Sequence, residues 1–447
     1  MAFESFEPSL LAQALEVLER GFEHLPAARA PLDLERARQA LIETAERLRD
    51  NYPYHHPLYV GQMLKPPHPV ARLAYALAMS INPNNHALDG GRASSAMEKE
   101  AVAGIARMFG WDSHLGHLCG GGTIANFEAL WVARELRPNQ AVVASSQAHY
   151  THRRLSAVLG ADFREVPTDA RGRMSVAALE SMLASGEIGT VVATLGTTAA
   201  GTVDPLPSIV GLRERFDFRL HVDAAYGGYF TLASNLAPET RAAFDAIPNA
   251  DSIVVDPHKH GLQPYGCGCV LFRDPAVGRF YRHDSPYTYF TSGDVHMGEI
   301  SLECSRAGAA AVALWTTMRM MPLERGGEFA RGLEAGREGA LALHHALSAD
   351  ERFAPLFDPE LDIVTWAVRA PTASQASAEA RRIFAAAARR DLHLAVASFP
   401  RALVEGSGAV RSWDADAVAC LRACVMKPEH RDWIPAIVQR LVAATVD

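Results

Sequence analysis

A lysine between two histidines is the first feature of this sequence that could do chemistry. Lys259 lies in the stretch DPHKHG, which follows the apolar run SIVV and precedes a glycine-rich stretch. An apolar run of this kind is typical of a buried strand, so the lysine falls at the end of an element inside the fold. A lysine among buried elements is costly unless its charge is paired or its amine is used chemically. Other residues of the sequence must therefore pair with this lysine or take part in its chemistry.

Three further clusters are candidates for a site. HLCGGGTIAN places Gly122 and Thr123 where a helix is predicted to begin, and free N–H groups at a helix start favour a phosphate. HVDAAYGG places Asp223 at the end of a predicted strand, and SSQAHYTH places His149 after another. Taken singly, each has an ordinary structural explanation, because such residues begin helices, form turns or pack in cores.

Together the clusters fit one cofactor, pyridoxal phosphate (PLP). Its phosphate needs a cradle, its pyridine nitrogen needs a carboxylate that keeps it protonated, and its aldehyde needs a lysine that forms a Schiff base. Ligands bind at the carboxyl ends of strands in doubly wound sheets, where these residues are expected. The 36 positions between Asp223 and Lys259 allow one intervening βα unit.

The predicted elements divide the chain into three parts. Residues 1–50 have two apolar stripes at helical spacing and predict an N-terminal helical arm. Residues 51–325 alternate helices with short, continuously apolar strands, which favours an α/β domain whose mostly parallel sheet is covered on both faces. Residues 326–447 mix helices and strands and predict a smaller α+β domain. The predicted strands include AVVAS, TVVATL, RLHVDAA, SIVVD and CVLFRD.

Composition limits the class of protein. The chain has 447 residues, 49% apolar and 21% charged, with a net charge of −8, which gives no electrostatic footprint for nucleic acid. The N-terminal stretch is acidic and lacks a signal-peptide pattern, and we expect no membrane span. The six cysteines form no CxxC pair or Cys/His ligand set, so we expect reduced thiols in the cytoplasm and no metal site.

The quoted motifs resemble those of a known family. LHVDAAYGGYF, ADSIVVDPHKHG and GGGTIANFEALWVAR, with QAHYTHRRLSAVLG and ATLGTTAAGTVDP, are similar to motifs of the group II PLP-dependent amino-acid decarboxylases. That group includes glutamate, aromatic amino-acid, cysteine-sulfinate and archaeal tyrosine/aspartate decarboxylases. The resemblance runs from about residue 50 to the C-terminus. It implies PLP fold type I, with a seven-stranded sheet in the large domain and a small C-terminal domain.

The resemblance also implies roles around the cofactor ring. Lys259 would be the Schiff-base lysine, and Asp223 would pair with the ring nitrogen. Ala225 would pack under one face of the ring. His149 would stack on the other face and assist protonation. Thr194 would lie near the ring hydroxyl.

Other roles concern the phosphate and the substrate. By resemblance, Gly122, Thr123 and His258 would meet the phosphate, and Ser305 would reach it from the neighbouring subunit. Arg422 would grip the α-carboxylate, which would help set the scissile bond perpendicular to the ring. If Ser305 acts across an interface, the active site needs two chains, and a twofold homodimer clamped by the N-terminal arm is the simplest assembly.

The sequence departs from the family pattern in three places. Asp256 stands where several animal enzymes have Asn, and Cys119 replaces a hydroxyl residue in the cradle. The long loop with a catalytic tyrosine has no clear counterpart, so Tyr287 and Tyr289 are candidates for returning a proton to the substrate carbon. Some family members without that tyrosine form aldehydes by oxidative decarboxylation, and that alternative stays open.

The side-chain pocket of the substrate is expected to include Gln62, Asn85 and His86. These polar residues, with Lys65 and Arg92 nearby, favour an acidic substrate such as glutamate or aspartate over an aromatic one. An aromatic substrate and others such as diaminobutyrate remain alternatives, since Asn, Pro and Asp also cap helices and shape loops.

Rival functions are another PLP reaction, a non-catalytic regulatory homologue, and a Rossmann nucleotide binder. The two motifs around Asp223 and Lys259 argue against a typical transaminase. Loss of either residue would mark a non-catalytic homologue, and both are present. The glycine run lacks the GxGxxG spacing of a dinucleotide site.

Overall fold

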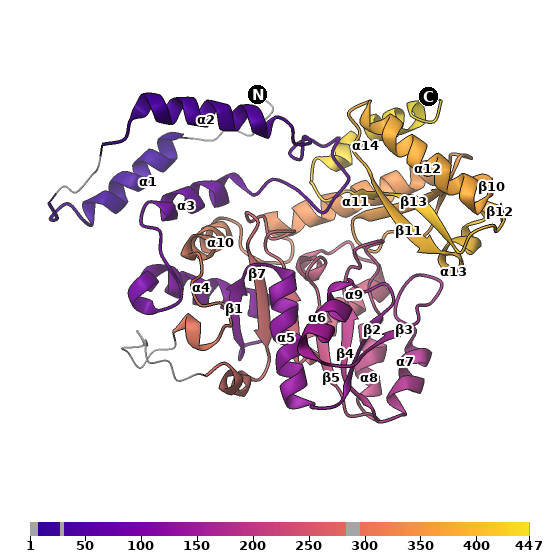
Figure 1. Cartoon of the computed structure of the whole chain (residues 1–447), viewed down its shortest axis with the longest axis horizontal. Helices are drawn as coiled ribbons and strands as arrows, with labels where there is room; N and C mark the ends of the chain where they lie inside the picture. The colour runs from indigo at the N-terminus through magenta and orange to yellow at the C-terminus, as the bar shows by residue number, and fades with distance from the viewer. Residues whose placement is uncertain (1–7, 27–30, 283–295, 447) are drawn as a thin grey trace.

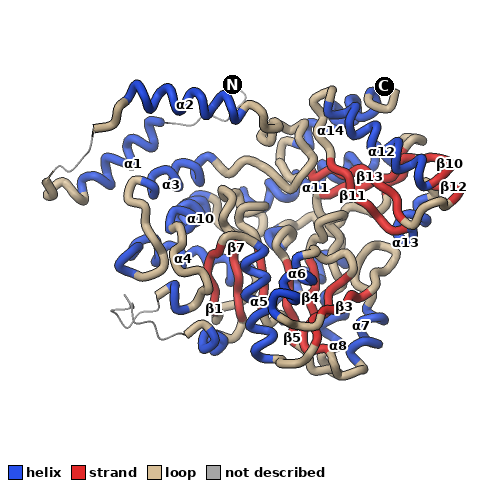
Figure 2. Tube along the Cα trace, viewed as in Figure 1, coloured by secondary structure: helices blue, strands red, loops and turns tan. Residues whose placement is uncertain are grey.

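The structure, a computed structural model, describes residues 8–26, 31–282 and 296–446. Figure 1 shows a helix-flanked sheet, a smaller group of strands at the C-terminal end and two helices of the N-terminal arm. Figure 2 shows the strands as two separate groups. The fold class predicted from the sequence, an α/β protein of PLP fold type I, is confirmed by this arrangement and by the structural neighbours described below.

The large sheet has seven strands in the order β1-β7-β6-β5-β4-β2-β3. The run from β6 to β3 is parallel, whereas β7 runs antiparallel to both of its neighbours. Because the carboxyl ends of parallel strands share one edge, the residues that follow β4, β5 and β6 meet there. The strands are β1 (Leu115–Cys119), β2 (Ala141–Ser145), β3 (Phe163–Val166), β4 (Ile188–Thr194), β5 (Arg219–Asp223), β6 (Ser252–Val255) and β7 (Gly268–Phe272).

Helices cover this sheet on both faces, which explains why its strands read as continuous apolar runs. Every residue of β2, β4, β6 and β7 is buried. In the described part of the chain, no helix is long and apolar enough to cross a membrane. The helices that precede or surround the sheet are α3 (Pro69–Met79), α4 (Leu88–Met108), α5 (Gly122–Leu136), α6 (Thr151–Leu159), α7 (Val176–Leu183), α8 (Leu206–Leu212), α9 (Pro238–Asp245) and α10 (Gly308–Met320).

A four-stranded antiparallel sheet, in the order β11-β13-β9-β8, forms the centre of the C-terminal part, and β10 and β12 pair in parallel beside it. Its strands are β8 (Phe353–Pro355), β9 (Ile363–Val368), β10 (Ala370–Thr372), β11 (Ala395–Pro400), β12 (Val410–Ser412) and β13 (Ala417–Cys424). Its helices are α11 (Glu328–Ser348), α12 (Ala373–Ala388), α13 (Arg401–Val404) and α14 (His430–Ala443).

One segment from the N-terminal half joins this C-terminal part. Leu58 and Val60 belong to its apolar core. The Val60 N–H donates to the carbonyl of His393 at 2.9 Å, and its carbonyl accepts the Cys424 N–H at 2.7 Å. The sequence predicts that residues 51–325 form the large domain, whereas Leu58 and Val60 pack in the core of the small domain and Val60 bonds to its sheet.

The two N-terminal helices have no core of their own. Every residue of α1 (Pro8–Arg20) and α2 (Leu34–Leu48) is at least partly exposed. Leu34 and Leu41 are 75% and 70% exposed, so α2 presents apolar side chains to its surroundings. Figure 1 shows both helices extending beyond α3, away from the large sheet.

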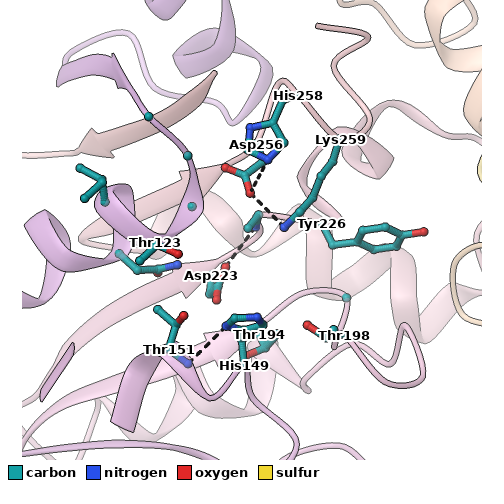
Figure 3. Close-up of a pocket in the computed structure, with 17 residues that line it drawn as sticks. Thr123, His149, Thr151, Thr194, Thr198, Asp223, Tyr226, Asp256, His258 and Lys259 are labelled. Atoms are coloured by element: carbon teal, nitrogen blue, oxygen red, sulfur yellow. Dashed lines mark hydrogen bonds and ion pairs between the residues drawn. The ribbon is translucent and has the colours of Figure 1, made fainter. Parts of the chain in front are cut away.

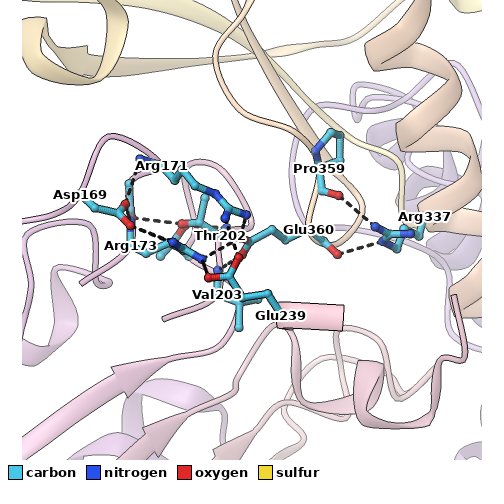
Figure 4. Close-up of polar contacts among 11 residues, drawn as sticks. Asp169, Arg171, Arg173, Thr202, Val203, Glu239, Arg337, Pro359 and Glu360 are labelled. Atoms are coloured by element: carbon cyan, nitrogen blue, oxygen red, sulfur yellow. Dashed lines mark hydrogen bonds and ion pairs between the residues drawn. The ribbon is translucent and has the colours of Figure 1, made fainter. Parts of the chain in front are cut away.

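A buried carboxylate ties the two sheets together. Glu360, just before β9, accepts the N–H of Val203 at 2.5 Å and pairs with Arg171 at 2.8 Å (Figure 4). Val203 forms a bridge with Leu195, the residue after β4. Arg337 of α11 donates to the carbonyl of Glu360 at 3.0 Å and holds the same segment from the other side. These contacts of Glu360 form a seam between the two sheets. The seam fixes the loop that follows β4.

Candidate active site

A cavity of about 280 Å³ lies at the carboxyl ends of β4, β5 and β6, beside the start of α5. It is the place where the topology brings the strand-end residues together. Several segments that are far apart in the sequence form its wall. The lining residues are Gly120, Gly121, Gly122, Thr123, Ile124, Asn126, His149, Thr151, Thr194, Gly196, Thr198, Asp223, Ala225, Tyr226, Asp256, His258 and Lys259.

Lys259 is paired inside this cavity with Asp256. Its Nζ lies 2.9 Å from Oδ2 of Asp256, whose side chain is 2% exposed (Figure 3). A tight turn makes the pair, because the Lys259 N–H donates to the Asp256 carbonyl at 2.9 Å. The cost of placing a lysine here is offset by this carboxylate. The i, i+3 spacing of the two residues is the signal in the sequence that could have predicted this pair.

Asp223 ends β5 and is held by two donors. Its Oδ1 accepts the Ala225 N–H at 3.1 Å, and its Oδ2 accepts from Nε2 of His152 at 2.8 Å. Burial alone would raise the pKa of Asp223. The hydrogen bond and charge of His152, with help from His221, outweigh burial and hold the pKa well below its usual range. Asp223 is therefore a fixed negative charge in the cavity wall.

The glycine run forms a close backbone cradle. Gly121 has φ +146°, a conformation that L residues rarely adopt. A Cβ on Gly122 would lie 2.7 Å from Oδ2 of Asp256, and one on Gly268 would lie 2.5 Å from the Cα of Gly121. Helix α5 begins at Gly122, and no side chain caps it. Its first N–H groups can therefore receive an anion such as a phosphate.

Some buried polar atoms of the cavity wall lack a protein partner. Among the residues that the structure describes, the Oγ1 of Thr194 and the Oδ1 of Asp256 are buried without a hydrogen bond. Buried polar groups are normally satisfied, so such atoms indicate a missing ligand. A ligand with a phosphate, a ring hydroxyl and a ring nitrogen would meet the cradle, Thr194 and Asp223. The residues present thus fit pyridoxal phosphate.

His149 lies in the wall directly before α6. Its Nδ1 accepts the Thr151 N–H at 3.2 Å. Burial lowers the pKa of His149, nearby Lys259 and His152 lower it further, and Asp223 raises it only in part. His149 is therefore a neutral ring at pH 7, and its proton is on Nε2.

Tyr226 connects the cavity to the small sheet. Its hydroxyl donates to Oδ1 of Asp362 at 2.6 Å, directly before β9. Burial, followed by the charge of Asp362, raises the pKa of Tyr226, whereas the charge of Arg422 lowers it. Burial likewise raises the pKa of Asp362 to about 6. Arg422 thus acts electrostatically on the cavity wall, although it does not line the cavity.

The cavity contains eight of the predicted site residues and leaves others out. Those in its wall are Gly122, Thr123, His149, Thr194, Asp223, Ala225, His258 and Lys259. Those outside it are Gln62, Asn85, His86, Ser305 and Arg422. Tyr287 and Tyr289 lie outside the described residues.

The predicted residues outside the cavity have other contacts. The Asn85 amide donates to Glu98 at 2.6 Å and accepts from Ser94 at 2.5 Å, so this fully buried side chain belongs to the framework around α4. The Oγ of Ser305 accepts from Asn84 at 3.2 Å. Arg422 is buried on β13 and contacts the Sγ of Cys424 at 3.0 Å. Spacing could not reveal these placements, because each depends on how distant segments pack.

Comparison with known families agrees with this geometry. Residues 54–369 match the family described as pyridoxal-dependent decarboxylase conserved domain. The L-tyrosine decarboxylase of Enterococcus faecium is 30% identical over 436 residues, which cover 73% of this chain and 71% of that protein. The Halobacterium salinarum protein named "Probable L-aspartate decarboxylase" is 34% identical over 231 residues, or 51% of this chain and 62% of that protein.

Solved structures share the fold. The crystal structure of mouse CSAD matches with a TM-score of 0.78 at 22% identity, covering 97% of this chain and 92% of that chain. At this level of identity the match concerns the fold alone.

Proposed function

We propose that this chain, which belongs to the pyridoxal-dependent decarboxylase family and is therefore a PLP-dependent carboxy-lyase, acts on an L-amino acid with an acidic side chain and uses Lys259 to hold its cofactor. The observation that carries the assignment of Lys259 is its position in one cavity with Asp223 and the glycine cradle. A non-catalytic homologue is disfavoured, because both charged residues are present in that cavity.

Each wall residue has a role that follows from its contacts. When bound, PLP supplies an electron-accepting ring for the electrons of the broken Cα–carboxylate bond. Asp223, an ionised and doubly anchored carboxylate, would hold the proton on the ring nitrogen. The N–H groups at the start of α5 would bind the phosphate, and the Thr194 hydroxyl would meet the ring oxygen. Ala225 is small enough to let the ring lie against the sheet edge.

Three residues would hold the cofactor, present a proton and orient the substrate. Lys259 would bind the cofactor covalently through Nζ and leave Asp256 as the nearby carboxylate. His149 would cover the ring and present the proton on its Nε2. Arg422 would orient the α-carboxylate from the small-domain side, consistent with its electrostatic influence on Tyr226.

The substrate class rests on charge near the cavity. Lys65 and Lys427 lie outside the cavity, and burial lowers the pKa of Lys65 to about 8 and of Lys427 to about 7. Lys65 nevertheless acts electrostatically on Asp362, the hydrogen-bond partner of Tyr226 in the cavity wall. A lysine charge that acts on a residue bonded to the cavity wall favours a second carboxylate on the substrate. An aromatic substrate is the second candidate, because a tyrosine decarboxylase is among the relatives that align over most of the chain.

The site is proposed to be completed by a second copy of the chain. Ser305 lies on the segment that follows residues 283–295 and is outside the cavity of its own chain, as expected for a residue that serves the partner's phosphate. The exposed apolar residues of α2, including Leu34 and Leu41, would pack on the partner. Deleting residues 1–50 should convert the dimer to monomer in light scattering and lower activity. A truncated protein that stays dimeric and fully active would contradict the clamp.

The cysteines support a cytoplasmic enzyme. None of the six is paired, and all but Cys304 are buried. Unpaired thiols of this kind are ordinary in a reducing compartment.

A panel of L-amino acids tests the function and its substrate. Purified protein with PLP would be assayed for CO₂, amine, aldehyde and hydrogen peroxide. We expect CO₂ and the matching amine from aspartate, glutamate or another acidic amino acid. Amine from tyrosine or tryptophan alone would replace the acidic assignment by the aromatic one. Aldehyde with peroxide would instead place the chain in the oxidative branch.

A further inference from the structure

A buried histidine that lies outside the cavity contacts its most important carboxylate. The Nε2 of His152 lies 2.8 Å from Oδ2 of Asp223, and the two side chains are 0% and 6% exposed. His152 is the second residue of α6, three positions after His149, and its N–H donates to the His149 carbonyl at 3.1 Å. The start of α6 therefore places His149 in the cavity wall and His152 against the Oδ2 of Asp223.

The hydrogen bonds around Asp223 define its orientation. With the Ala225 N–H on Oδ1 and His152 on Oδ2, each oxygen has one protein donor, and the remaining lone pairs are left for the cavity. The Ala225 bond alone would leave the carboxylate free to turn about its Cβ–Cγ bond. The second donor fixes its plane.

No other polar group competes for His152. Among the described residues its Nδ1 is buried without a hydrogen-bond partner, so the bond to Asp223 is the one polar contact that orients the ring. The neighbouring His221 is engaged elsewhere, with Ser252 at 2.9 Å and Asn126 at 2.8 Å. The geometry is that of a dedicated support for one carboxylate.

We propose that His152 is a positioning residue that orients Asp223 and keeps its charge available to the cofactor's ring nitrogen. The inference rests on the proposed role of Asp223. His152 does not line the cavity, and its hydrogen bond to Asp223 is the contact through which it would act on the cofactor. Removing it leaves a carboxylate that is free to rotate and holds the ring nitrogen less firmly. The consequence is weaker PLP binding and a slower chemical step, with little change in the affinity for substrate.

The test compares His152→Leu with His152→Gln. Leucine fills similar space without a donor, whereas the amide of glutamine can reach Oδ2 from about the position of Nε2. We expect His152→Leu to raise the Kd for PLP about 10- to 100-fold, to lower kcat by a similar factor and to change KM less than threefold, because charge-assisted hydrogen bonds have about this strength. The visible absorbance band of the bound cofactor should shift. His152→Gln should recover most of each loss.

His117→Leu is the matched control. His117 forms a similar buried pair with Glu128, 2.9 Å apart, but does not contact Asp223. Its loss should lower thermal stability while changing the PLP Kd less than threefold. If His152→Leu does not fold, His152→Met replaces it, because methionine adapts to the same space without a donor.

Three outcomes would overturn the proposal. They are an unchanged PLP Kd and absorbance band in His152→Leu or His152→Met, no recovery in a folded His152→Gln, or an equal rise in Kd in His117→Leu. PLP binding is measured without substrate. A protein that binds PLP through Lys259 but decarboxylates nothing would therefore contradict the proposed function and still test His152.

Discussion

Two buried carboxylates, Asp223 in the cavity and Glu360 at the seam between the sheets, have pKa values that are shifted in opposite directions. Each residue is 5% exposed. The pKa of Asp223 lies well below its usual range, whereas burial raises the pKa of Glu360 to about 7. Burial by itself therefore does not decide the charge of a carboxylate in this protein.

The partners explain the difference. His152 is fully buried and donates to Asp223 alone. At the seam, Arg171 is 49% exposed and divides its charge between Glu360 and Glu239, so water and a second acid weaken its effect on Glu360. A buried donor that bonds to one carboxylate keeps the pKa of Asp223 low. A half-exposed arginine that two carboxylates share does not do the same for Glu360.

The two regions also differ in how completely their hydrogen bonds are made. At the seam both carboxylate oxygens of Glu360 have protein partners, and Arg337 adds bonds to the backbone (Figure 4). In the cavity the Thr194 hydroxyl and one oxygen of Asp256 are left open (Figure 3). The completed network is structural, and the incomplete one is where a ligand is expected.

The largest effect is expected from Lys259→Ala. Turnover should fall at least about 10⁴-fold, because Lys259 carries the only amine among the described residues that line the cavity. The visible band of the bound cofactor should disappear in an absorbance spectrum. Lys259→Arg, which keeps a positive charge beside Asp256, is the control and should be equally inactive. Activity in the arginine variant would mean that charge rather than covalent bonding is what matters.

Asp223→Asn should come next. It keeps the size of the side chain but removes the negative charge, so kcat should fall about 10²- to 10⁴-fold. Steady-state kinetics with saturating PLP would measure the loss. Glu360→Gln in parallel should keep kcat within about threefold. Equal losses in the two variants would remove the distinction between the regions.

Glu360→Gln should instead change how stability depends on pH. The folded pKa of about 7 exceeds the ordinary 4.5, so the folded protein binds more protons than the unfolded chain between these values. The wild-type free energy of unfolding should therefore decline as pH rises through this window, by about 2 to 3 kcal/mol at most. The glutamine variant should lack that decline. Urea unfolding at pH 5 and pH 7.5 would measure it, and parallel pH curves for the two proteins would contradict the assignment.

Arg171→Ala should have the smallest effect. The arginine is half-exposed, so its loss should cost no more than about 1 kcal/mol, less at high salt. Unfolding at low and high ionic strength would measure the cost. A loss of several kcal/mol would show that the seam depends on this arginine more than its exposure allows.

The sequence predicted the sheet and much of the cavity, for a physical reason. Asp223 and Lys259 follow consecutive parallel strands, and the ends of such strands must meet at one edge. Thr194 and His149 are placed by the same rule. Continuous apolar runs predicted β2, β4 and β6 because helices cover both faces of the sheet.

Contacts between distant segments could not be predicted in this way. Asn85 was expected in the substrate pocket, but its amide satisfies Glu98 and Ser94, which only the packing of α4 brings near. His152 has no motif of its own, and its three-residue spacing from His149 gains meaning only when Asp223 is seen behind it. Residues 58–60 join the small sheet through pairing across more than 300 positions.

The most direct test is CO₂ release by the wild-type protein and by Lys259→Ala, both supplied with PLP, across the amino-acid panel. We expect CO₂ with an equal amount of amine from at least one acidic amino acid for the wild-type protein, and none for the variant. Undiminished CO₂ release by Lys259→Ala would contradict the covalent role of Lys259 and the function proposed for this cavity.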